Sequence, residues 1–178
     1  GVPYMGVGRN MAYRKDLFFK NRGFASHQHI KSGDDDLFVN ETGNSSNTEV
    51  VIGSLANTIS KPKESFNDWF HQKRRHMTTG KQYKAAHLFL LAALTGSVVV
   101  FHAAFLALII VGFQWNIVLG IFGARMLIQL LIFQQSEKKM GERGIWYCAP
   151  VFEILLILIY PLITLSNLVI KPGKWKTI

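Results

Sequence analysis

The sequence has 178 residues and only one cysteine, Cys148, which excludes a secreted domain held together by disulfides. It has no low-complexity segment, and its 13 Phe, 4 Trp and long apolar runs exclude a disordered chain. Acidic residues are few, with Asp+Glu 11 against Lys+Arg 20. Charge of either sign is almost missing from residues 85–135, where Arg125 is the only charged residue. The chain therefore consists of a polar, basic first half and an apolar second half.

Three apolar segments, residues 85–113, 115–133 and 145–170, make up the second half. A bilayer core of about 30 Å requires about 20 apolar residues in a helix, so each segment is long enough to cross it. We therefore predict a transmembrane region over residues 85–170. Arg125 and Glu153 lie within these segments, where polar residues usually face the protein interior. They are at similar depths, so we expect an ion pair that either holds the helices together or contacts a lipid-linked acceptor.

The positive charges predict the orientation of these segments. Lysine and arginine are concentrated in residues 61–84 and 134–144, whereas the loop around residues 112–116 has no charge. The positive-inside rule therefore places residues 1–84 in the cytoplasm. Few cysteines and short loops suggest a bacterial inner membrane. Three full spans would leave the basic tail, residues 171–178, outside; either its three lysines are tolerated there or the last segment turns back at Pro161.

The first half shows weaker local signals. Residues 10–13 predict a short strand, residues 14–18 the start of a helix that stops near Gly23, and residues 49–59 are β-prone. Ser65 and Asp68 have the spacing of a capping box before an amphipathic helix over residues 63–84. Phe66, Trp69, Phe70 and Lys73 form an aromatic stripe on that helix, which is typical of a helix at a membrane surface.

Basic and acidic clusters in this half suggest several kinds of site. Lys73-Arg74-Arg75 beside aromatic residues is compatible with nucleic-acid binding, but contact with anionic lipid explains it more simply, so we expect no nucleic-acid partner. Asp34, Asp35 and Asp36 are consecutive carboxylates that repel one another. They suggest a general base, ligands for Mg²⁺ or Mn²⁺, or simply the acidic first turn of a helix.

The order of these motifs resembles the C-terminal half of a processive-type family 2 glycosyltransferase. In that family a Gly-Glu-Asp or Gly-Asp-Asp motif supplies the catalytic base, and Gln-x-x-Arg-Trp follows on an interfacial helix. The corresponding residues here are Gly33-Asp34-Asp35 and Gln72-Lys73-Arg74-Arg75-His76, and His76 replaces the tryptophan. The segment of residues 8–15 is similar to the one that lies beside the donor sugar.

The resemblance implies roles for individual residues. The catalytic base is Asp34 or Asp35, depending on whether the acid triplet is aligned from Leu37 or from Gly33. The residues implied to bind the acceptor or donor are Asn10, Tyr13, Gly33, Asp36, Gln72, Arg75 and His76. No metal ligand is implied within the chain.

The fold implied is α+β/α, with residues 1–62 as the acceptor-side part of a GT-A-like α/β domain, followed by about three transmembrane helices. The implied activity is inverting transfer of a sugar from a nucleotide-sugar to a glycan or lipid-linked hydroxyl, as in cell-envelope polysaccharide synthesis. A divalent cation, Mg²⁺ or Mn²⁺, would be held by a preceding half of a longer parent enzyme, and the isolated 178 residues would be inactive. The alternative is a non-catalytic membrane-anchored scaffold or lipid-surface binding protein.

Overall fold

The computed structural model describes residues 2–30, 32–142 and 144–169, and over these ranges it contains helices and no strand. The predicted α+β/α class with a GT-A-like α/β part is therefore wrong. Residues 11–14 are extended, and residues 49–59 contain only the short 3₁₀ helix η2, Ser54–Ala56. An extended segment becomes a strand only when it pairs with another one, and neither segment does so in the described ranges.

The chain divides into two compact units. The first contains residues 2–51, residues 58–89 and the chain from Pro161 onward, and the second contains Ile52–Asn57 and Leu90–Tyr160. The boundaries at residues 89 and 160 both fall within long helices.

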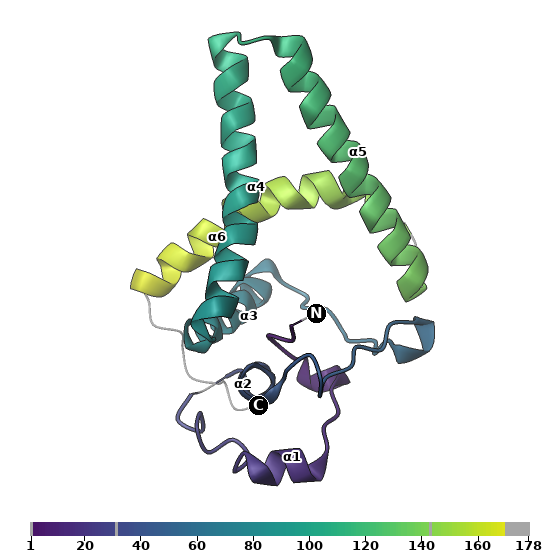
Figure 1. Ribbon diagram of the computed structural model, residues 1–178. Helices are drawn as coiled ribbons and strands as arrows, with labels where there is room; N and C mark the ends of the chain where they lie inside the picture. The colour runs from purple at the N-terminus through teal and green to yellow at the C-terminus, as the bar shows by residue number, and fades with distance from the viewer. Residues whose placement is uncertain (1, 31, 143, 170–178) are drawn as a thin grey trace. The chain divides into compact units, whose positions relative to one another are not determined.

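The first unit begins with three short helices: η1, Gly8–Asn10; α1, Lys15–Lys20; and α2, Asp34–Thr42 (Figure 1). The predicted helix start near Arg14 is confirmed, and the helix ends where Arg22 and Gly23 take left-handed backbone angles. Leu37 and Phe38 of α2 are buried and form the centre of this unit. The acid triplet occupies the first turn of the same helix, so the unit's core fixes the position of these carboxylates.

Helix α3, Phe66–Thr79, follows in the first unit and continues into the 3₁₀ helix η3, Gly80–Gln82. The predicted cap is confirmed, because the amide of Asp68 donates to Ser65 Oγ at 3.1 Å. Phe66 stacks with Trp69 and Phe70, and the Lys73 ammonium lies 5.9 Å from the Trp69 ring centroid. The aromatic stripe that the sequence predicts is therefore present.

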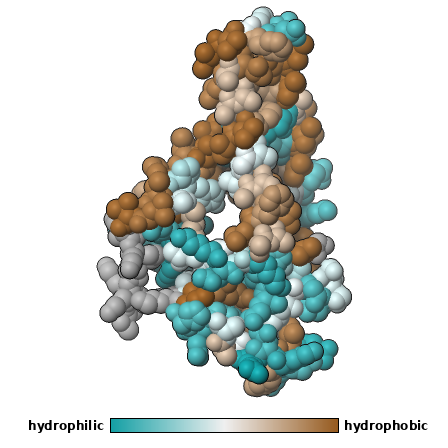
Figure 2. Space-filling model, turned by 60° about the vertical axis from the view of Figure 1, so that its left-hand side comes forward, coloured by the Kyte–Doolittle hydropathy of each residue, from teal (hydrophilic) through white to brown (hydrophobic). Residues whose placement is uncertain are grey.

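Three helices are long and apolar enough to cross a membrane, the features of an integral membrane protein. They are α4, Ala85–Val111; α5, Trp115–Met140; and α6, Ala149–Val169, which follows the 3₁₀ helix η4, Trp146–Cys148. Most of their apolar side chains are exposed, and Figure 2 shows such side chains gathered along these helices. In water this exposure would be costly, whereas acyl chains can cover it. Helix α6 continues through Pro161 without a break.

Candidate functional site

The acid triplet lies at the N-terminus of α2, where Gly33 forces a sharp entry. Gly33 has φ 84° and ψ 28°, a left-handed conformation in which glycine alone is unstrained. A Cβ at this position would lie 2.1 Å from Cγ2 of Thr79, which is almost fully buried. Gly33 is therefore required both by its backbone angles and by the close approach of the end of α3. The helix dipole at this terminus favours ionised carboxylates.

The Asp35 carboxylate accepts hydrogen bonds from two backbone amides. Its Oδ2 accepts the amide of Gly8 at 2.7 Å, and its Oδ1 accepts the amide of Asp36 at 3.0 Å. A Cβ on Gly8 would lie 3.1 Å from Oδ2, so glycine permits this short contact. Asp35 thus ties the N-terminal segment to α2, a link between residues 27 apart that the sequence patterns did not predict.

Asp34 is exposed and faces a pocket of about 370 Å³. No hydrogen bond or ion pair joins its carboxylate to another residue that the structure describes. The residues lining the pocket come from the N-terminal segment, the loop after α1 and the start of α2: Gly8, Met11, Ala12, Tyr13, Phe24, Asp34 and Asp35. Of the residues that the resemblance implies, Asp34, Asp35 and Tyr13 therefore line one pocket.

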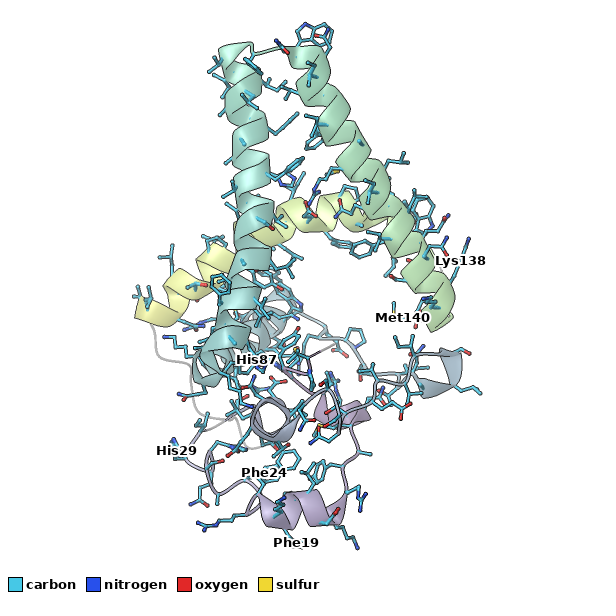
Figure 3. All side chains as sticks on the ribbon, viewed as in Figure 1. Phe19, Phe24, His29, His87, Lys138 and Met140 are labelled. Atoms are coloured by element: carbon cyan, nitrogen blue, oxygen red, sulfur yellow. The ribbon has the colours of Figure 1, made fainter. Side chains whose placement is uncertain are left out.

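Aromatic rings form one wall of this pocket. The Tyr13 ring stacks on Phe18 at 5.5 Å between centroids and lies 4.7 Å from the buried Phe38. Phe24, labelled in Figure 3, packs edge-on against Phe18 at 5.2 Å. The Tyr13 side chain is 42% exposed, so part of its ring remains available to a ligand. Carboxylates beside an aromatic surface suit a polyhydroxylated ligand with apolar C–H faces.

Asp36 points away from solvent and is buried beside Tyr83. Burial, together with the negative charge of Asp35, raises the pKa of the Asp36 carboxyl, although the Tyr83 hydroxyl and the Gly6 amide partly oppose this effect. Burial and the neighbouring Asp36 raise the pKa of Tyr83 as well. Asp36 is therefore a structural group within the unit and is not among the residues that line the pocket.

Positive charge from α3 gathers around His76 at the edge of the acidic site. Partial burial lowers the pKa of His76, and the charges of Arg75 and Lys73 lower it further, while Asp35 has the opposite effect. Arg9, from η1, contributes to the same positive field. His76 is thus within electrostatic range of Asp35, and the charge of Arg75 acts on the same imidazole. Gln72 and Asn10 are not among the pocket-lining residues.

Arg74 has a different role from the lipid contact that the sequence suggested. It is 5% exposed, and its Nε donates to Asn167 Oδ1 at 3.0 Å, while Asn167 Nδ2 donates to the Arg74 carbonyl at 3.0 Å. Its Nη2 also donates to the Ser166 carbonyl at 3.1 Å. This reciprocal pair joins α3 to the last turns of α6. The sequence separation of 93 residues left no local pattern that could reveal it.

Asn40 makes a second buried connection that the sequence did not indicate. Its Nδ2 donates to the Tyr4 carbonyl at 2.7 Å and to Nδ1 of His87 at 2.8 Å. Its Oδ1 accepts the amide of Lys84 at 3.0 Å, just before α4 begins. All three interactions hold the helix of the acid triplet against the first turn of α4, where Figure 3 labels His87.

The second unit contains a polar cluster within its apolar helices. Arg125 Nη1 lies 2.6 Å from Glu153 Oε1, so the predicted pair forms. Gln129 Nε2 donates to Glu153 Oε2 at 2.5 Å, and His102 Nε2 lies 3.4 Å from Oε1. The Arg125 guanidinium also lies over the Phe101 ring at 4.9 Å. His102 and Gln129 extend the predicted pair into a network that joins α4, α5 and α6.

A metal site finds no support in the described ranges, where no three His, Cys, Asp or Glu side chains converge on one point. The acid triplet fans out around the first turn of α2, with Asp34 exposed, Asp35 on backbone amides and Asp36 buried. The three carboxylates of the triplet therefore do not form a three-ligand cluster within the described residues.

Comparisons with known proteins identify no protein similar to this chain. No family model matches the chain, and no curated protein or solved structure is significantly similar to it. Over the described residues the protein is helical, with three helices long and apolar enough to cross a membrane and a polar unit that carries an acidic pocket. Its function has to be argued from that pocket.

Proposed function

We propose that the chain forms the acceptor side and the membrane anchor of an enzyme that transfers a sugar from a nucleotide-sugar to a hydroxyl. Asp34 is the general base in this proposal. The observation that carries the proposal is the difference between two adjacent carboxylates. Asp35 accepts two backbone amides, whereas Asp34 is exposed in the pocket. This difference supports the alignment of the acid triplet that makes Asp34 the base.

The chemistry requires an ionised carboxylate within reach of the acceptor. The acceptor oxygen attacks the anomeric carbon, the bond from that carbon to the diphosphate oxygen breaks, and its electron pair leaves with the nucleoside diphosphate. The acceptor proton passes to the Asp34 carboxylate, which acts as the general base. Attack opposite the leaving group inverts the anomeric configuration.

Other groups of the site fit supporting roles. The partly exposed Tyr13 ring offers a surface on which a sugar can stack. The positive field of Arg75, Lys73 and Arg9 complements the charge that develops on a leaving diphosphate. Asp35 acts as a positioning residue, because its bond to the Gly8 amide holds one wall of the pocket.

The test replaces Asp34 with Asn in the full-length gene product and measures sugar transfer in native membranes with a panel of nucleotide-sugars. We expect turnover to fall by about 10²–10⁴-fold, the usual contribution of a general base, with unchanged membrane insertion. Asp16→Asn is the matched control, because Asp16 is also exposed in a first helical turn but pairs with Arg14 away from the pocket.

Asp35→Asn separates positioning from proton transfer. It weakens the bond to Gly8, so we expect a raised KM and reduced thermal stability with a smaller loss of kcat than in Asp34→Asn. Full turnover in Asp34→Asn would refute the assignment of the base. Absence of transfer with every donor would favour the non-catalytic scaffold.

A further inference from the structure

We propose that the segment of residues 144–169, which contains α6, enters and leaves the membrane through the same face, the one on which α4 begins. Its exposed apolar surface then sits among the acyl chains of that leaflet and does not cross to the other one. The proposal concerns how the chain lies in the lipid and is independent of any enzymatic activity.

The first end of α6 is held beside the end of α5. Glu137, in the last turn of α5, accepts the amides of Gly144 and Ile145 at 3.1 and 2.8 Å. Glu137 is 7% exposed, and its carboxylate closes the short connection that leads into η4 and α6. The connection into α6 therefore starts at the end of α5, and α6 itself reaches the level of Arg125, which Glu153 contacts.

Helices α4 and α5 are joined by a short turn. Gly112 takes φ 73° there, and α5 begins at Trp115, three residues later. Each helix has an apolar stretch long enough to cross the bilayer. Two successive crossings place the start of α4 and the end of α5 on the same face. The connection into α6 starts on that face.

The other end of α6 is held by α3 within the first unit. The reciprocal hydrogen bonds between Arg74 and Asn167 join the two helices, and Ile163 of α6 is completely buried in the same unit. Helix α3 ends at Thr79, and α4 begins at Ala85 after the short helix η3. Asn167 therefore lies on the face on which α4 begins.

Helix dimensions make a crossing incompatible with these contacts. From Ala149 to Asn167 a helix extends about 27 Å, close to the thickness of the hydrocarbon core. If α6 crossed, Asn167 would emerge at the opposite face, where it could not reach Arg74. A helix that stays in one leaflet satisfies both contacts.

The exposed side chains of α6 and the charges that follow it in the sequence indicate that acyl chains of one leaflet cover this helix. Leu155, Leu158, Leu162 and Leu165 of α6 are 43–59% exposed, while Ile163 packs inward. The sequence after α6 contains Lys171, Lys174 and Lys176, which lie outside the described residues. A turn back to the starting face puts these lysines on the same side as the basic residues before α4, as the positive-inside rule requires.

Topology reporters test this proposal. In a Cys148→Ser background, single cysteines are introduced at Phe113 in the α4–α5 turn, at Lys139 near the end of α5, and at Leu168 near the end of α6. A membrane-impermeant maleimide is applied to intact cells and to inverted vesicles. We expect Leu168→Cys to be labelled from the same side as Lys139→Cys and from the side opposite to Phe113→Cys.

A second measurement covers the case in which lipid shields Leu168→Cys from the reagent. Green fluorescent protein and alkaline phosphatase are fused separately after Ile178; in a bacterial host the first is fluorescent only inside and the second active only outside. Fluorescence without phosphatase activity, with Lys139→Cys also labelled from inside, supports the proposal. Phosphatase activity, or labelling of Leu168→Cys together with Phe113→Cys, overturns it.

Discussion

The two units bury polar groups in different surroundings. In the first, Asn40 makes three hydrogen bonds that join three parts of the chain, and two of these go to backbone groups. In the second, Glu153 receives Arg125, Gln129 and His102 from two other helices, and these helices expose mostly apolar side chains. The first network links segments of irregular backbone through hydrogen bonds of a neutral amide. The second links three regular helices through an ion pair and its hydrogen-bonding neighbours.

The difference teaches where each unit is vulnerable. A polar group uncovered in the first unit can reach water after a small movement. A polar group that loses its partner among lipid-covered helices has no water within reach. It stays unsatisfied in hydrocarbon, which costs several kcal/mol. The expected effects therefore decrease from the membrane junction to the acidic turn and then to the titrating groups.

The largest effect is expected for Glu153→Gln. The change removes the negative charge that Arg125 faces at 2.6 Å and leaves the guanidinium uncompensated. We expect the second unit to lose about 3–5 kcal/mol of unfolding free energy, the usual cost of breaking one partner of a buried pair. Unfolding in detergent, followed by tryptophan fluorescence, measures this loss.

The double variant Arg125→Met/Glu153→Met is the matched control. It removes both charges, so we expect it to regain most of the stability that Glu153→Gln loses. A double variant as unstable as Glu153→Gln would show that the charges do not act as a pair. Recovered stability with altered enzymatic activity would instead favour contact with a lipid-linked acceptor.

A smaller effect is expected for Gly33→Ala in the first unit. The added methyl group meets Cγ2 of the buried Thr79 at 2.1 Å, and the left-handed backbone at φ 84° disfavours any Cβ. We expect a loss of about 2–4 kcal/mol, which combines left-handed strain with overpacking. Circular dichroism during thermal unfolding reports it.

Thr79→Ala separates the two causes in the Gly33 variant. Combined with Gly33→Ala it removes the contact at 2.1 Å, leaves the one with the Cβ of residue 79 at 2.9 Å and keeps the strained backbone, so it should restore only part of the stability. Complete restoration would show that the left-handed conformation contributes nothing, and no restoration would show that the clash is unimportant.

The same comparison explains what the sequence could predict. Residues 85–113, 115–133 and 145–170 were recognised as helices because lipid leaves only internal hydrogen bonding to an apolar run of that length. The strand expected at residues 10–13 was wrong, because this segment packs Tyr13 against aromatic rings and its backbone finds no strand to pair with. The three long helices could be predicted because they depend on local apolar runs. The extended segments could not, because their structure depends on contacts with residues distant in the sequence.

Parts of the site could be predicted from local patterns. The Ser65–Asp68 cap, the aromatic stripe of α3 and the carboxylates at the start of α2 all depend on neighbouring residues. The division of labour between Asp34 and Asp35 depends on the amide of Gly8, 27 residues away, and no spacing rule indicates it. The Arg74–Asn167 pair was missed for the same reason.

The smallest effect is the pH dependence of the first unit, where two groups act in opposite directions. The lowered pKa of His76 means that the native state holds its neutral form, so the unfolded chain binds a proton first below about pH 6.5. This contribution to stability is lost as the pH falls. The raised pKa of Asp36 means that the unfolded chain releases its proton first above 3.8, so stability is lost as the pH rises through the window above that value.

Single variants separate these two contributions, which partly cancel in the native protein. Relative to the native chain, His76→Gln should gain stability as the pH falls from about 7 to about 5, and Asp36→Asn should gain stability as it rises from about 4 to about 6. The changes should be small because solvent screens the partly exposed His76. Thermal unfolding midpoints across this range provide the measurement, with Asp16→Asn as the surface control.

Parallel pH profiles for His76→Gln and the native chain would show that His76 does not titrate differently in the folded unit. Parallel profiles for Asp36→Asn and the native chain would show that burial does not raise the pKa of Asp36 in the folded unit.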